Sequence, residues 1–253
     1  GFAFIAVAVL TIVLAVHWPG LDSAALCFDD SEYLTRNPLV QNPSFASVGT
    51  FVREVLEPST VHGYYQPLTM ISLMLDYAAG GRPDHLLTFH RTSLLLHLAN
   101  TLLIVILLYQ LFRDAWAAGL AGLLFGVHPM TVENIFWVGE RKTVLAAFFV
   151  LIALVAYVHY ARRSRRWAYG LSIVAFVLGL LAKPTITPLP VCLLLLDLWP
   201  LDRLIARADA GRPVLRIWRW LLDRRVLLEK IPFLLIACVS AIITFESQRR
   251  TAG

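Results

Sequence analysis

Long apolar runs alternate with short polar segments along most of the chain. An α-helix of about 20 predominantly apolar residues is long enough to cross a bilayer. The pattern therefore predicts about seven membrane-spanning helices, at residues 2–18, 86–112, 115–127, 144–160, 167–182, 186–199 and 231–245. The third and sixth runs are short, so their ends are the least well defined.

The longest polar interruption, residues 19–85, follows the first apolar run. Turn signals at Asn37-Pro38 and Asn42-Pro43 divide it. Residues 45–55 could form a short interfacial helix. Residues 68–79 are moderately apolar but short, and they carry Asp76. We expect that run to be a surface or re-entrant helix within a long first outer loop.

Composition supports a membrane protein. Of 253 residues, 58% are hydrophobic and 15% are charged, whereas soluble domains carry about 25% charged residues. We predict one all-α, polytopic helical bundle over residues 1–253. The three cysteines, Cys27, Cys192 and Cys238, are too far apart for a disulfide framework or a metal motif.

The net charge is +5, and its distribution predicts the orientation. Basic residues lie in short loops, not as a patch on a soluble domain, so no nucleic-acid partner is expected. Cytoplasmic loops are enriched in Lys and Arg. With Gly1 in the cytoplasm, the inner loops hold Arg113, Arg162, Arg163, Arg165, Arg166, Arg203, Arg207, Arg212, Arg216, Arg219, Arg224, Arg225 and Lys230. Residues 201–230, with Trp218 and Trp220, then read as a cytoplasmic amphipathic linker.

In this orientation the acidic stretch Asp29, Asp30 and Glu32 faces outward, toward the periplasm of a bacterium or the lumen of a eukaryote. A solvated loop or helix cap would explain it by itself. Cations at the same boundary, Arg141, Lys142 and Lys183, offer a second explanation. In a glycosyl transfer from a lipid phosphate, a carboxylate would accept the proton of the attacking hydroxyl, and cations would stabilise the departing phosphate.

Other polar residues within the apolar runs have structural explanations. His97 and Asn100 lie one helical turn apart, and we expect interhelical hydrogen bonds from them. Asp197 lies near the inner end of the sixth run, and we expect it to pair with a cytoplasmic arginine.

Several ordered motifs point to a known family. Residues 128–145 read HPMTVENIFWVGERKTVL, Lys183-Pro184 precedes LLDLWPL at 195–201, and EKIPF at 229–233 precedes Thr244 and Gln248. With Phe28-Asp29-Asp30 and the YQPL of residues 65–68, these stretches resemble TMTC-type proteins. These are membrane proteins of the GT-C glycosyltransferase superfamily, and the resemblance is to its bacterial members. Gln66 stands where the family has arginine, and Ser93 where it often has asparagine.

The resemblance implies a GT-C-like fold and a donor sugar, typically mannose or another hexose, carried on polyprenyl phosphate. The acceptor would be a Ser or Thr hydroxyl of a protein on the outer face, here the periplasmic face of a bacterial inner membrane. Asp29 or Asp30 would be the base, with Asp30 slightly preferred, and Arg141, Lys142 and Lys183 would bind the donor phosphate. The residues expected to shape the site are Glu32, His62, Tyr65, Gln66, His90, His128, Glu133 and Gln248.

Direct attack by the acceptor would invert the anomeric centre, as water does in inverting glycosidases. Carboxylate oxygens suit hard cations, so a divalent metal at Asp29 and Asp30 is a further hypothesis.

Two other functional classes compete with the transferase. A non-catalytic GT-C-like subunit of a larger membrane complex would keep the fold without the activity. A transporter would place ionisable groups near the bilayer midplane, whereas here they gather at one face. No 34-residue self-similarity typical of tetratricopeptide repeats is present. Either the chain is the membrane part of a longer protein, or the repeats are missing.

Overall fold

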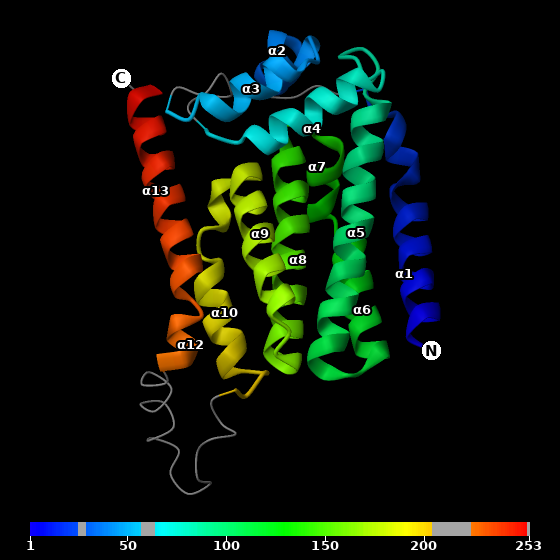
Figure 1. The fold of residues 1–253 in the computed structure, drawn as a ribbon. Coiled ribbons are helices and arrows are strands. Elements are labelled where there is room, and N and C mark those ends of the chain that lie inside the picture. Colours follow the sequence, from blue (N-terminus) through cyan, green and yellow to red (C-terminus); the bar gives the residue numbers. More distant parts are fainter. Residues whose placement is uncertain (25–28, 57–63, 204–223, 252–253) are drawn as a thin grey trace, which may run out of the picture.

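The computed structural model describes residues 1–24, 29–56, 64–203 and 224–251, which are helical and contain no strand. Four helices belong to long apolar segments: α1 (Phe2–His17), α5 (Leu87–Phe112), α8 (Arg141–Arg163) and α13 (Ile231–Thr251). They stand side by side, and short helices lie across one end of the bundle (Figure 1). The prediction of an all-α polytopic bundle is confirmed.

Every predicted apolar run contains a helix. The remaining helices of the bundle are α6 (Ala115–Gly126), α7 (Met130–Phe136), α9 (Arg166–Ala182) and α10 (Leu189–Leu198). In the described part of the chain, four segments are long and apolar enough to cross a membrane: Phe2–Asp22, Leu87–Phe112, Val138–Arg163 and Arg225–Arg250. A fifth arises if α6 and α7, bent by 62°, form one broken span, while α9 and α10 are shorter. The count of seven stays a prediction.

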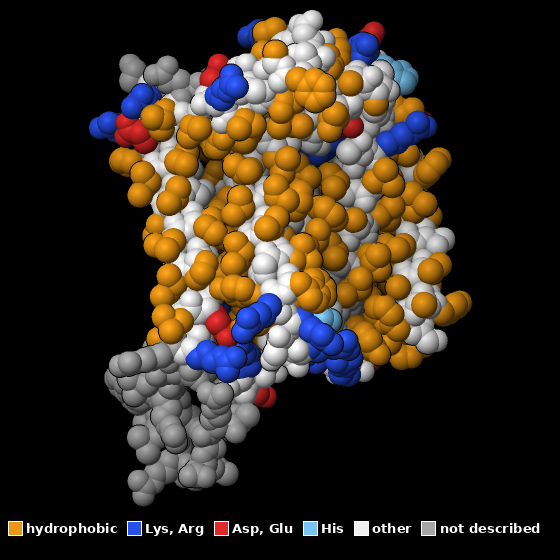
Figure 2. All heavy atoms as spheres, in the orientation of Figure 1, with side chains coloured by type: hydrophobic (Ala, Val, Ile, Leu, Met, Phe, Trp, Pro, Cys, Tyr) orange, Lys and Arg blue, Asp and Glu red, His pale blue; other side chains and the backbone are white. Residues whose placement is uncertain are grey.

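Apolar side chains cover the middle of the bundle, and charged side chains gather at its two ends (Figure 2). Helices suit this environment because they satisfy their backbone hydrogen bonds internally. Close approach depends on small residues at the helix interfaces. A Cβ atom at Gly122 of α6 would collide with Val105 of α5. His97 and Asn100 donate between helices, to the carbonyls of Gly126 and Val144, each at 2.9 Å, as predicted.

Short helices cover the end of the bundle that carries residues 19–85. They are the π-helical turn η2 (Ser31–Thr35), α2 (Pro38–Gln41), α3 (Phe45–Arg53) and α4 (Pro67–Ala78). The Ser44 hydroxyl accepts from the backbone N–H of Ser47 and caps α3. The two helices predicted here are confirmed as α3 and α4, and α4 lies across the bundle end (Figure 1). Buried Tyr33, Phe51 and Met70 pack these segments together.

A buried ionic cluster closes the opposite end. Lys230, at the start of α13, lies 2.5 Å from Asp197 of α10 and also donates to Tyr157 of α8. Arg203 bonds Asp197 at 2.8 Å and Glu229 at 2.7 Å. The predicted pairing of Asp197 with an arginine is confirmed. Most of the predicted linker 201–230 lies outside the described residues.

This cluster predicts a stability effect. Lys230 is 1% exposed and Asp197 is fully buried. Lys230→Met would leave a buried carboxylate with one cationic partner, and breaking such a pair costs on the order of 3 kcal/mol. We expect a clearly lowered thermal midpoint in detergent. Arg249→Met removes an exposed ion pair at the other end and should leave the midpoint nearly unchanged; equal midpoints for the two variants would contradict the structural role.

Candidate functional site

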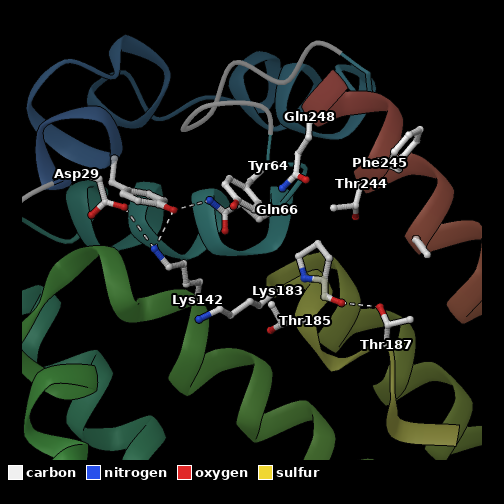
Figure 3. Close-up of a pocket in the computed structure, with 13 residues that line it drawn as sticks. Asp29, Tyr64, Gln66, Lys142, Lys183, Thr185, Thr187, Thr244, Phe245 and Gln248 are labelled. Carbon is white, nitrogen blue, oxygen red and sulfur yellow. Dashed lines mark hydrogen bonds and ion pairs between the residues drawn. The ribbon is translucent and has the colours of Figure 1, made fainter. Parts of the chain in front are cut away.

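A cavity of about 680 Å³ opens at the bundle end that carries the short helices. Its walls come from the segment between α1 and α5, the start of α8, the turn after α9 and the last part of α13 (Figure 3). Five of its residues are predicted site residues: Asp29, Gln66, Lys142, Lys183 and Gln248. The others are Tyr33, Tyr64, Pro184, Thr185, Thr187, Ala241, Thr244 and Phe245.

Lys142 of α8 contacts two other residues of the cavity wall, Asp29 and Tyr33. Its Nζ atom lies 3.4 Å from Asp29 Oδ2 and 3.2 Å from the Tyr33 hydroxyl. That hydroxyl also accepts from Gln66 Nε2 at 2.6 Å. Burial raises the pKa of Tyr33 above its usual value, against the effect of nearby Lys142, so the phenol keeps its proton at neutral pH. The wall therefore presents a carboxylate, an ammonium group and a neutral hydroxyl together.

Lys183 brings a second cation to the cavity. It lies where α9 ends and the 3₁₀ turn η5 (Pro184–Ile186) begins. Its Nζ atom donates to Thr143 Oγ1 at 2.7 Å and lies 3.5 Å from Glu140 Oε2. Glu140 also lies 3.3 Å from Lys142. Two lysines more than 40 positions apart in the chain thus meet at one carboxylate.

Asp29 and Asp30 have different environments. Asp29 lines the cavity, and its side chain is 30% exposed. Asp30 is 1% exposed, and its Oδ1 accepts from the backbone N–H of Gly139 at 2.7 Å. A Cβ atom at Gly139 would lie 2.9 Å from Asp29 Oδ1 and 3.1 Å from Asp30 Oδ1, so glycine lets both carboxylates approach. Asp29 therefore faces the cavity, and Asp30 holds the loop against Gly139. Which of the two is the base stays a prediction.

Arg141, which was predicted to bind the donor phosphate, does not line the cavity. It is fully buried and lies 2.7 Å from Asp76 of α4. It also donates to Ser72, Ser93 and the carbonyl of Phe89. Because these groups already engage the guanidinium, Arg141 is a framework residue that ties α8 to α4 and α5.

Several other predicted residues lie outside the cavity lining. Tyr65 donates to the carbonyl of Val52 and borders a smaller groove of about 140 Å³. His90 is fully buried, with Nδ1 3.1 Å from the carbonyl of Leu21. His128, which precedes α7, and Glu133, within α7, are exposed, and Glu32 is half-buried. His62 lies outside the described residues.

The sequence prediction missed several groups that the fold brings to the site. Tyr33 lies four positions after Asp29, a spacing of about one helical turn that could have marked it. Thr185 and Thr187 follow the predicted Lys183 closely, and Thr244 and Phe245 precede Gln248 by one turn. Nothing in the sequence marked Glu140 as a site residue except its position next to Arg141 and Lys142.

Among the described residues, no group of three or more His, Cys, Asp or Glu side chains is placed to hold an ion. A metal at Asp29 and Asp30 stays a hypothesis. Asp29 contacts an ammonium group and Asp30 a backbone N–H. The arrangement suits an anionic ligand at the lysines, beside a carboxylate that can accept a proton.

The chain is similar to proteins named protein O-mannosyl-transferases. It is 34% identical over 148 residues to Tmtc2 of Drosophila melanogaster, covering 55% of this chain and 16% of that protein. It is 30% identical over 162 residues to human TMTC2, covering 60% of this chain and 19% of that protein. It is 30% identical over 157 residues to human TMTC4, covering 55% of this chain and 21% of that protein. The chain thus spans about a fifth of the length of these relatives. No family model matches the chain, and no solved structure does.

The two aspartates should differ in their effect on stability. Asp30→Ala removes the acceptor of the buried Gly139 N–H, and an unsatisfied buried donor costs about 1–3 kcal/mol. Asp29→Ala removes a partly exposed side chain and should change stability little. Thermal unfolding in detergent would check this, and a larger loss for Asp29→Ala would contradict the assignment.

Proposed function

We propose that this chain is the membrane domain of a TMTC-type transferase that moves a hexose, typically mannose, from polyprenyl phosphate to a protein Ser or Thr hydroxyl. The observation that carries the proposal is the meeting of Asp29, Lys142 and Lys183 in one cavity at the end of an apolar bundle. A lipid-linked donor needs this combination, because its chain belongs in the bilayer and its phosphate at the boundary. The similarity to protein O-mannosyl-transferases supports the acceptor and the sugar.

In the proposed reaction, the acceptor hydroxyl oxygen attacks the anomeric carbon of the donor sugar. The bond between that carbon and the phosphate oxygen breaks, and its electron pair leaves with the polyprenyl phosphate. Asp29 accepts the hydroxyl proton, while Lys142 and Lys183 stabilise the charge that develops on the phosphate. Attack opposite the leaving group inverts the anomeric centre.

Neutral polar groups supply the third component of the proposed site. Tyr33, Gln66 and Gln248 line the cavity with hydroxyl and amide groups. Such groups can hydrogen-bond sugar hydroxyls without adding charge. We therefore assign the donor phosphate to the lysines and the sugar to the space between these residues and Asp29.

The proposed orientation puts the cavity on the non-cytoplasmic side. The cluster Arg162, Arg163, Arg165 and Arg166 connects α8 to α9 at the opposite end of the bundle. Short Arg-rich loops favour the cytoplasm, which supports an outward-facing cavity. The periplasmic face of a bacterial inner membrane is part of the proposal, although the relatives compared are animal proteins.

Transfer of radiolabelled mannose from polyprenyl phosphomannose to membrane protein tests the proposal. We expect Asp29→Asn to lower transfer at least about 100-fold, within the range for a general base. Lys183→Gln should raise the apparent KM for the donor, because a charge-assisted contact to phosphate is lost.

Arg249→Gln, outside the cavity lining and exposed at the same end, is the matched control and should transfer normally. Each variant is first checked for membrane insertion and thermal unfolding. Absence of transfer by the intact protein with several sugar donors, or transfer that is indifferent to Asp29→Asn, would favour a non-catalytic membrane subunit instead.

A further inference from the structure

Glu140 contacts both lysines of the cavity but does not line it. One carboxylate oxygen lies 3.3 Å from Lys142 Nζ, and the other lies 3.5 Å from Lys183 Nζ. The second oxygen also accepts a hydrogen bond from the Thr143 hydroxyl, which in turn accepts from Lys183. The side chain is 15% exposed. Glu140 therefore pairs with both cations without itself lining the cavity.

The backbone on both sides of Glu140 is held by buried contacts. Gly139 donates to the carboxylate of Asp30. Arg141 is fully buried against Asp76 and three further acceptors. These contacts hold the backbone at Glu140 in place, and the two lysines and the Thr143 hydroxyl hold its side chain. Glu140 therefore acts as a counterion of both lysines.

The charges around the lysines already compensate each other. Lys142 and Lys183 contribute two positive charges, and Asp29 and Glu140 lie within 3.5 Å of them with two negative charges. An anionic ligand that reaches the lysines is therefore repelled by carboxylates at short range. This repulsion grows in proportion to the charge of the ligand.

The two lipids of the proposed reaction differ in charge. A polyprenyl phosphosugar is a phosphodiester with one negative charge. The polyprenyl phosphate left after transfer is a monoester, with a charge of about −1.5 to −2 at neutral pH. Two uncompensated lysines would bind the product more tightly than the donor and retard its release.

We propose that Glu140 lowers the affinity of the cavity for the doubly charged lipid phosphate. The product is then released more readily than it would be from the two lysines without this carboxylate. This inference rests on the proposed function in one respect, that the lysines bind a polyprenyl phosphate. It assigns Glu140 as a positioning and affinity-setting residue that touches no reacting atom.

The test is direct binding of two probes to the purified full chain. One probe is a short-chain polyprenyl phosphate, and the other is its methyl phosphodiester, which has the same lipid and one charge. Glu140→Gln keeps the shape and removes the charge. We expect binding about threefold tighter for the diester and about tenfold tighter for the monoester, from Coulomb repulsion across about 6 Å in bulk water.

Two variants control for shape and location. Glu140→Asp keeps the charge and should preserve the wild-type ratio of the two dissociation constants. Asp84→Asn removes an exposed carboxylate at the same end, outside the cavity lining, and should bind both probes as wild type does. Because the ratio is measured within each protein, a shift in overall lipid affinity cancels.

An unchanged monoester-to-diester ratio in Glu140→Gln would overturn the inference, as would a failure of the wild type and the variant to bind either probe. The proposed transferase activity can fail separately. A protein that transfers no sugar but shows the charge-dependent ratio keeps this assignment of Glu140 and loses the catalytic one. A protein that transfers sugar but shows an unchanged ratio keeps the catalytic assignment and loses this assignment of Glu140.

Discussion

The buried ion pair between Arg141 and Asp76 fixes the segment on which the cavity depends. A charge inside a helical bundle is costly unless it is paired and hydrogen-bonded. Arg141 meets this requirement with Asp76 at 2.7 Å and three further acceptors from α4 and α5. The pair therefore sets where α8 begins relative to the helix that lies across the bundle end.

Four successive residues at that point each contact a different part of the structure. Gly139 holds Asp30, Glu140 contacts both lysines, Arg141 binds α4 and α5, and Lys142 reaches Asp29 and Tyr33. These four adjacent residues therefore position the charged groups around the cavity. A rigid site of this kind can stabilise developing charge without first reorganising.

Much of the fold could be predicted from the apolar runs, because membrane helices need length and apolarity more than a specific partner. The end of the third run at residue 127 agrees with the end of α6, but the helix α7 that follows and its 62° bend relative to α6 were not predicted. Within the site, Asp29, Lys142 and Lys183 were identified from residue type and boundary position. The separate roles of Asp29 and Asp30 depend on which one meets Gly139, a contact across 109 positions.

Arg141 shows the limit of sequence reasoning most clearly. Adjacent basic residues on a helix point in directions about 100° apart, so Arg141 enters the framework while Lys142 enters the cavity. The sequence contained Asp76 but no sign that it would be the partner of Arg141. Glu140 was overlooked for the same reason, because its importance comes from Lys183, which the fold brings from the end of another helix.

The most direct measurement is an experimental structure of the protein in lipid nanodiscs with a non-hydrolysable polyprenyl phosphosugar. We expect the phosphate within hydrogen-bond distance of Lys142 and Lys183, the lipid chain in the membrane, and the anomeric carbon on the side of Asp29. A donor bound with its phosphate away from both lysines, or bound at the opposite end of the bundle, would contradict the assignment of this cavity as the transfer site.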